Sequence, residues 1–169
     1  SVPSHAYFLV GGTSGANGTA FPRPADVTTG LAAGGTAGQV FLADSATGIN
    51  AGSGAVIDYS AGKVIDFFGY GTASAYETAV KTGSITTAQS YKRTGLVDGD
   101  NNNTDFTIAA VNAASGSGTG VGPDSCDCVA TSSLKITEVY TDGGQPGSAY
   151  AHDFVELQNR SEEHMSELQ

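Results

Sequence analysis

The chain has 169 residues, enough for one domain with a buried core, and only 14% of them are charged, against roughly 25% in an ordinary soluble domain. Its formal net charge of −10 argues against nucleic acid or an anionic membrane as an electrostatic partner, because there is no basic surface to neutralise phosphates. No run approaches the roughly 18 apolar residues of a membrane-spanning helix, so no membrane span is predicted.

Short strand-like runs separated by glycine-rich turns fill residues 1–112. The runs expected to be strands are 6–10, 38–45, 63–71, 90–94 and 106–110. In the second run, Val40 and Leu42 face one side and Phe41 the other, as in a half-buried strand. The third run is apolar on both sides, which is typical of a strand in the centre of a packed sheet. Residues 72–80 indicate either one helical turn or an irregular loop.

Residues 114–133 combine alternating Gly and Ser with a proline and the pair Cys126 and Cys128. This composition is typical of a linker. The cysteines favour an oxidising compartment, and two thiols alone cannot form a closed zinc site. The strand pattern returns at 134–140 and 153–159, and no helical period appears before residue 160. The sequence therefore predicts an all-β protein.

The sequence blocks around these strands resemble those of the lamin-tail domain family. In the first piece the matching blocks are VPSHAYFLV, VIDFFGYGTASAYE and KRTGLVDGDNNNTDFT. In residues 133–159 they are an ITEV strand, a Gly-rich loop and DFVELQN. The blocks keep the family's order within each piece. The resemblance implies an immunoglobulin-like β-sandwich.

The order of the two pieces is unusual, because the first lacks the front of a domain and the second lacks the back. We predict the closing two thirds of one lamin-tail-like domain (1–113), a Gly/Ser/Cys linker (114–133), the first strands of a second such domain (134–159) and a non-native tail (160–169). Cut domains expose unpaired strand edges. We therefore expect residues 134–140 and 153–158 to pair with the first piece, giving one sandwich in circularly permuted order.

The last ten residues, RSEEHMSELQ, hold the only methionine and differ in composition from the rest of the chain. They resemble the conceptual translation of a widely used sequencing adapter, from which they differ at Met165. We therefore interpret them as an artefact of sequence assembly. The alternative is a charged C-terminal helix, because Glu, Met, Leu and Gln are good helix formers.

The family resemblance implies a non-catalytic structural or interaction module of a secreted or cell-surface bacterial protein. Similar modules accompany nuclease or phosphatase domains, and any such domain would lie outside this sequence. The expected partner is a protein or another surface ligand, and not nucleic acid. No enzymatic activity and no obligatory cofactor are predicted for these residues.

The loop of residues 98–105 is the best candidate for a binding site. Its candidate metal ligands are Asp98, Asp100, Asn102 and Asp105. Their alternating carboxylate and amide oxygens can converge on a hard cation such as Ca²⁺. The loop is not an EF-hand, which requires Gly where Asn103 stands and Glu where Ala109 stands. An Asx-rich turn whose side chains bind their own backbone is the alternative. A calcium- or carbohydrate-binding module using this loop is the second functional hypothesis.

A third hypothesis concerns Glu138 and Glu156, which lie on neighbouring predicted strands. Such a pair of carboxylates could act as acid and base in the hydrolysis of a glycosidic bond. Paired carboxylates alone are a weak signal, and the family resemblance supplies no such activity. Hydrogen bonding to loop backbone, or exposure to solvent, is the alternative.

Overall fold

The computed structural model describes residues 6–44, 64–112 and 134–159, and all structural statements below concern these residues. Their regular secondary structure consists almost entirely of strands: β1 (Tyr7–Gly11), β2 (Val27–Thr28), β3 (Gly38–Ala43), β4 (Val64–Tyr70), β5 (Gln89–Arg93), β6 (Phe106–Ala110), β7 (Leu134–Tyr140) and β8 (Phe154–Asn159). One short helix, α1 (Asn102–Asp105), precedes β6. The predicted all-β class is confirmed.

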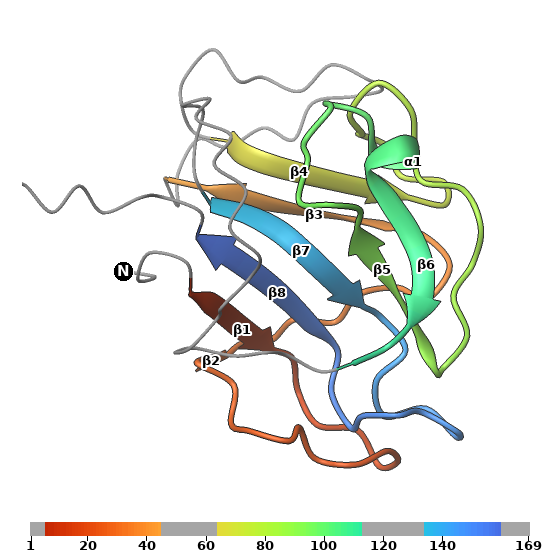
Figure 1. Ribbon diagram of the computed structural model, residues 1–169. Coiled ribbons are helices and arrows are strands. Elements are labelled where there is room, and N and C mark those ends of the chain that lie inside the picture. Colours follow the sequence, from red (N-terminus) through yellow and green to blue (C-terminus); the bar gives the residue numbers. More distant parts are fainter. Residues whose placement is uncertain (1–5, 45–63, 113–133, 160–169) are drawn as a thin grey trace, which may run out of the picture.

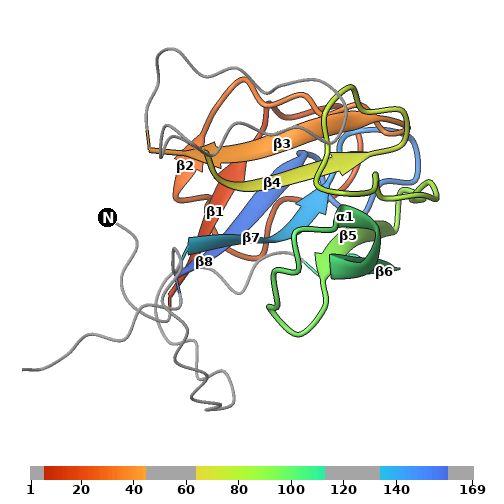
Figure 2. The same cartoon turned by 90° about the horizontal axis from the view of Figure 1, so that it is seen from above.

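The strands form two sheets. The larger has six strands in the order β2-β1-β8-β7-β5-β6, and β3 and β4 form the second. Figures 1 and 2 show the β3–β4 layer lying across one face of the larger sheet. Two packed sheets with a shared core are a β-sandwich. The finer immunoglobulin-like topology stays a prediction.

The last two strands occupy the centre of the large sheet. β8 runs antiparallel to β1, from Gln158 opposite Tyr7 to Phe154 opposite Gly11. β7 runs antiparallel to β5, with Val139 opposite Tyr91. The predicted pairing of these strands with the first piece is confirmed. The domain boundaries, and the description of this order as a circular permutation, stay predictions.

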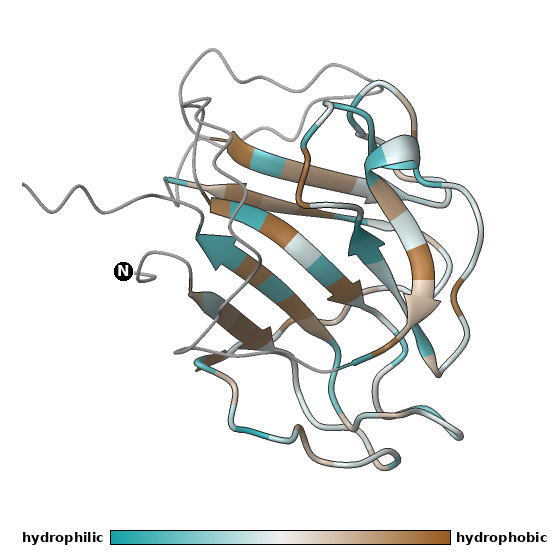
Figure 3. Cartoon of the chain, in the orientation of Figure 1, coloured by the Kyte–Doolittle hydropathy of each residue, from teal (hydrophilic) through white to brown (hydrophobic). Residues whose placement is uncertain are grey.

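The main core, the largest cluster of buried hydrophobic residues, depends on both pieces of the chain. From β4, Phe68 and Tyr70 reach Tyr91 of β5, with ring centroids 5.3 and 5.0 Å apart respectively. Hydrophobic residues recur along the strands of both layers (Figure 3). The buried members of this core contributed by β7 and β8 are Ile136, Val139, Tyr140, Phe154, Val155 and Leu157, six of twelve. Without these two strands, residues 6–112 lack half of the buried core.

The central position expected for residues 63–71 was wrong. Among the described residues β4 has one strand partner, β3. Its apolar outer side is nevertheless buried, because Phe67 is 0% exposed and stacks on Phe41 with centroids 5.9 Å apart. Val40 and Leu42 pack against the main core, as their alternation with Phe41 predicts. A strand that is apolar on both sides therefore has both of its faces buried, and this pattern does not require a paired strand at each edge.

The remaining differences from the sequence prediction are local. α1 lies in the predicted polar loop, β2 lies in a predicted turn region, and residues 72–80 contain no helix. Within the described ranges no helix is long and apolar enough to cross a membrane. The predicted linker with its two cysteines, and the predicted tail 160–169, lie outside the described residues.

Candidate functional site

The side chains of the four candidate ligands in the 98–105 loop do not converge on one point. Asp100 is exposed and has a positive φ of 52°. Asn102 is 0% exposed and its side chain binds the backbone of β4. Asp98 and Asp105 both approach the guanidinium of Arg93, at 3.3 and 3.8 Å. The structure thus brings two of the four candidate ligands, Asp98 and Asp105, together around the guanidinium of Arg93.

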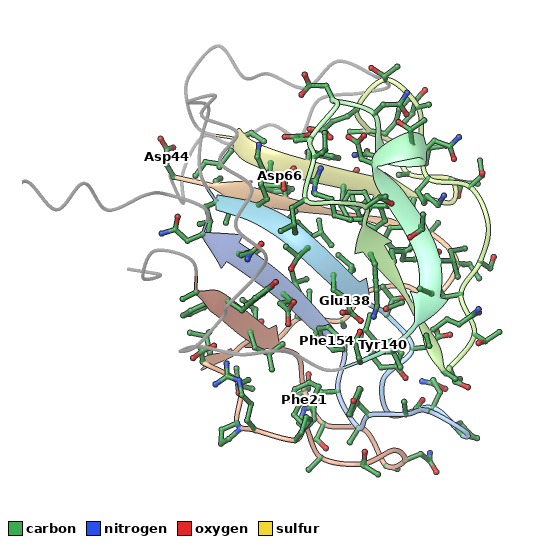
Figure 4. All side chains as sticks on the ribbon, viewed as in Figure 1. Phe21, Asp44, Asp66, Glu138, Tyr140 and Phe154 are labelled. Carbon is green, nitrogen blue, oxygen red and sulfur yellow. The ribbon has the colours of Figure 1, made fainter. Side chains whose placement is uncertain are left out.

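Arg93 and Asp66 form a buried ion pair between the two sheets. Arg93 Nη2 donates to both carboxylate oxygens of Asp66, at 2.6 and 2.8 Å, and both side chains are 0% exposed. Arg93 Nε donates to the carbonyl oxygen of Ile136 at 2.8 Å. The amide of Ile136 donates in turn to Asp66 Oδ2 at 2.6 Å. The pair therefore joins β4, β5 and β7 (Figure 4 labels Asp66).

A second cation, Lys135, binds Asp98 at the edge of this cluster. Lys135 Nζ donates to Asp98 Oδ2, and Arg93 Nη1 donates to Asp98 Oδ1. Burial raises the pKa of Asp66 to about 6, although the charge of Arg93 opposes the rise. Burial also acts to raise the pKa of Asp98, but Lys135 and Arg93 outweigh it and hold that pKa below its ordinary value. Asp98 is thus stabilised as a carboxylate by the two neighbouring cations.

Asn102 fixes α1 with four hydrogen bonds, two to β4 and two to Glu77. Its Oδ1 accepts from the amides of Gly69 and Glu77, both at 2.9 Å. Its Nδ2 donates to the carbonyl oxygen of Phe67 and to Glu77 Oε2, both at 2.8 Å. Every hydrogen-bonding position of the buried amide group is therefore used within the protein.

Two other loop side chains, Asp105 and Asn101, bind the backbone of the loop itself. Asp105 Oδ2 accepts from the amides of Gly99 at 2.8 Å and Asn101 at 3.1 Å. Asn101 Oδ1 accepts from the amide of Asn103 at 3.1 Å and so caps α1. These are the bonds of an Asx-rich turn, the alternative to a metal loop. Calcium binding by Asp98, Asp100, Asn102 and Asp105 stays a prediction.

The side chains of Asp66, Glu77 and Asp98 bring one carboxylate oxygen each within 4.8 Å of one another, as a metal site would. However, Asp66 holds Arg93, and Asp98 holds Arg93 and Lys135. A divalent cation would have to compete with these two internal cations for the same oxygens. The arrangement is therefore that of an acidic cluster whose negative charge is partly neutralised by Arg93 and Lys135.

Glu138 and Glu156 lie directly opposite each other on β7 and β8, on the face turned away from β4. Both residues are buried, at 5% exposure each. Glu138 Oε1 accepts from Ser90 Oγ at 2.6 Å, and Thr137 Oγ1 donates to Glu156 Oε1 at 3.2 Å. Burial raises the pKa of Glu138, and the bond from Ser90 opposes the rise. The expected position on neighbouring strands is confirmed, and hydrogen bonds within the sheet hold both groups.

An open pocket of about 480 Å³ lies elsewhere, between the loops at 13–15, 31–35 and 141–145. Asp142 and Asp153 line it, and burial raises the pKa of both carboxyl groups. Asp153 accepts from the amides of Gly143 at 2.8 Å and Ala33 at 3.0 Å. Asp153 thus ties two loops together at the base of this pocket.

The buried Asp66–Arg93 pair and this pocket were missed at the level of sequence. Asp66 interrupts an apolar strand, VIDFFGY, and a single carboxylate in such a run is a signal of a buried pair. Nothing local indicated that its partner would be Arg93, 27 residues further along the chain.

No protein-family model matches the chain, and comparison with curated proteins and with solved structures finds no significant match for it. The resemblance to lamin-tail domains therefore stays a prediction that rests on the sequence blocks.

Proposed function

We propose that this chain is a non-catalytic structural or interaction module. The observation that carries the proposal is how its buried charged side chains are used. Arg93 and Asp66 join three strands from positions that solvent does not reach. A general acid or base must come within hydrogen-bond reach of a substrate. Charges enclosed between two sheets connect strands of the scaffold and do not meet that requirement.

Three other carboxylates, of which Glu138 and Glu156 are buried, support the same proposal. Glu138 is bound by Ser90, Glu156 by Thr137, and Asp153 by two loop amides. Each of these contacts connects neighbouring strands or loops. Their common role is to satisfy polar groups inside a protein with few charged residues, as buried polar groups require.

We further propose that the module is of the lamin-tail type and belongs to a secreted or cell-surface bacterial protein. The sequence blocks around β1, β4 and β8 support this assignment, and the two-layer β architecture agrees with it. Its partner would be a protein or another surface ligand. A nuclease or phosphatase domain that it serves would lie outside the present sequence.

Hydrolytic assays test the proposal. The purified chain is incubated with chromogenic glycosides and with chromogenic phosphate mono- and diesters. We expect product release no faster than in buffer. Turnover that is lost in Glu138→Gln but kept in Asp98→Asn would overturn the proposal, because it would assign catalysis to the carboxylate pair on β7 and β8.

A further inference from the structure

The segment 134–159, which we call the inserted hairpin, is held by its two outer edges. β8 pairs with β1 and β7 pairs with β5, while β7 and β8 pair with each other. The rest of the described chain, residues 6–44 and 64–112, therefore forms a slot with one free strand edge on each side. Figure 1 shows the two blue strands filling this slot between β1 and β5.

Polar contacts line the slot along its whole length. At one end, Ile136 exchanges hydrogen bonds with Arg93 and Asp66. At the other, Tyr140 Oη donates to the carbonyl oxygen of Thr87 at 2.7 Å. The hairpin's loop adds backbone bonds between Thr19 and both Ala149 and Ala151, at 2.8 to 3.0 Å. Each of these contacts joins the hairpin to residues 6–112, so each can form equally well with a hairpin from another chain.

The covalent connection between slot and hairpin is long. Residues 113–133 are rich in Gly and Ser, and 21 residues reach about 70 Å when extended. Linkers of Gly- and Ser-rich composition give the two segments that they join an effective concentration on the order of millimolar. Exchange between two chains keeps every slot contact, so it competes with closure within one chain when the chain concentration approaches that value.

We propose that the inserted hairpin is exchangeable, and that the slot between β1 and β5 binds the hairpin of a second copy of this chain. The product is a reciprocal dimer in which each sandwich is completed by residues 134–159 of the other copy. The inference goes beyond the proposed function, because it depends on the strand order alone and needs no assignment to a family.

The register of β1 and β8 provides a specific probe. Tyr7 and Gln158 are opposite each other. The amide of Asn159 donates to the carbonyl oxygen of Ala6 in the neighbouring pair, so Tyr7 and Gln158 form a non-hydrogen-bonded pair. Such pairs have Cα atoms roughly 4.5 Å apart, within disulfide range. One full-length chain carries Tyr7→Cys and another Gln158→Cys, both with Cys126→Ser and Cys128→Ser.

The two chains are mixed in denaturant, refolded together at about 1 mM, the effective concentration of such a tether, and then oxidised. We expect a disulfide-linked heterodimer that runs at twice the chain mass without reductant. Each variant refolded alone is the control, because neither contains the opposing cysteine. Refolding that yields only monomers without this disulfide would overturn the proposal.

Two further measurements guard against a variant that fails to fold. The double variant Tyr7→Cys and Gln158→Cys in one chain should close within the chain at about 10 μM, well below the tether's effective concentration. If this disulfide did not form, Tyr7 and Gln158 would not be opposite each other, and the proposed slot would be contradicted. The chain with only Cys126→Ser and Cys128→Ser, refolded at both concentrations, should give a dimer on size exclusion only from the concentrated sample. Identical monomer profiles would again contradict exchange.

Discussion

At the scale of single residues, Arg93 has the most consequential surroundings. Its guanidinium contacts Asp66, Asp98 and the carbonyl oxygen of Ile136, and lies 4.5 Å from the ring centre of Phe106. A buried pair is weak evidence for net stabilisation, but removal of one partner leaves an uncompensated charge. Variants of Arg93 should therefore act on the whole fold.

The change Arg93→Met keeps a long apolar side chain and removes the charge. We expect it to lower the free energy of unfolding by about 3–5 kcal/mol, because Asp66 then remains buried without a cation. Chemical denaturation followed by circular dichroism measures this. The matched control is Arg23→Met, which breaks the more exposed pair with Asp26 and should cost about 1 kcal/mol or less. Equal losses in both variants would contradict a special role for the buried pair.

Asp98 should contribute a pH-dependent part of the stability. Its folded pKa lies below its ordinary value, and the unfolded value is about 3.9. A depressed pKa gives stability that is present above the unfolded pKa and is lost as pH falls through the folded pKa. The melting temperature of the wild type should therefore exceed that of Asp98→Asn at pH 7, and the difference should shrink below about pH 4.

Melting curves of both proteins between pH 7 and pH 2.5 test this expectation, with the difference between them isolating Asp98 from other titrating groups. A difference between wild type and Asp98→Asn that grows in acid would contradict the assignment.

The contribution of Asp66 to stability has the opposite pH dependence. Its pKa is raised to about 6, so its contribution is present below about pH 4 and is lost as pH rises through about 6.

At the scale of elements, the segment from Val97 to α1 is held by side-chain hydrogen bonds and a few backbone bonds to Glu77 and Ala79, and not by strand pairing. α1 has only four residues, too few for intrinsic helix stability. Asn102 attaches it to β4, and Asn101 and Asp105 bind backbone amides of the preceding turn. The position of the whole loop therefore depends on a few amide and carboxylate groups.

The change Asn102→Asp preserves side-chain size but removes the donor that binds Phe67 and Glu77. It also places a carboxylate against Glu77. We expect a loss of roughly 3 kcal/mol in the free energy of unfolding, because buried groups are left unsatisfied. The control is Asn103→Asp, since Thr82 binds only the acceptor oxygen of Asn103. A similar loss in both variants would mean that charge at the loop, and not the buried amide, determines stability.

The same loop determines the expected response to calcium. Its carboxylates already bind Arg93, Lys135 and backbone amides. We therefore expect an unchanged melting temperature at about 1 mM Ca²⁺, a concentration that saturates many extracellular calcium modules. A rise in melting temperature that Asp100→Ala abolishes would instead support the calcium-binding hypothesis for Asp98, Asp100, Asn102 and Asp105.

At the scale of the whole molecule, two segments far apart in sequence share one core. The inserted hairpin supplies six of the twelve buried residues of the main cluster and separates β1 from β5. Cooperative folding therefore requires both segments, since neither can bury its apolar face alone.

A chain ending at residue 112 should consequently fail to fold. It would lose β7 and β8 and expose the edges of β1 and β5, which favours aggregation. We expect poorly dispersed amide proton signals and no cooperative thermal transition, measured with the intact chain as reference. A cooperative transition of residues 1–112 would show that the hairpin is dispensable to the fold.

Local patterning was sufficient for the all-β class and for every described strand except β2. Alternation placed Val40 and Phe41 on opposite sides of β3, and the run VIDFFGY identified the most buried strand. α1 and β2 were not predicted, because elements of four and two residues are too short to show a hydrophobic periodicity. Of the four predicted loop ligands, spacing alone could not show that Asn102 turns to β4 while Asp98 turns to Lys135.

The sequence by itself determined which residues alternate, where turns fall and how little charge the surface carries, because these depend on neighbours along the chain. Tertiary structure alone decided that Asp66 meets Arg93, that Glu138 meets Glu156, and that β4 is covered on both sides without being central. Those outcomes follow from which strand faces pack together. That choice is made by the burial of the whole core, to which distant segments contribute at once.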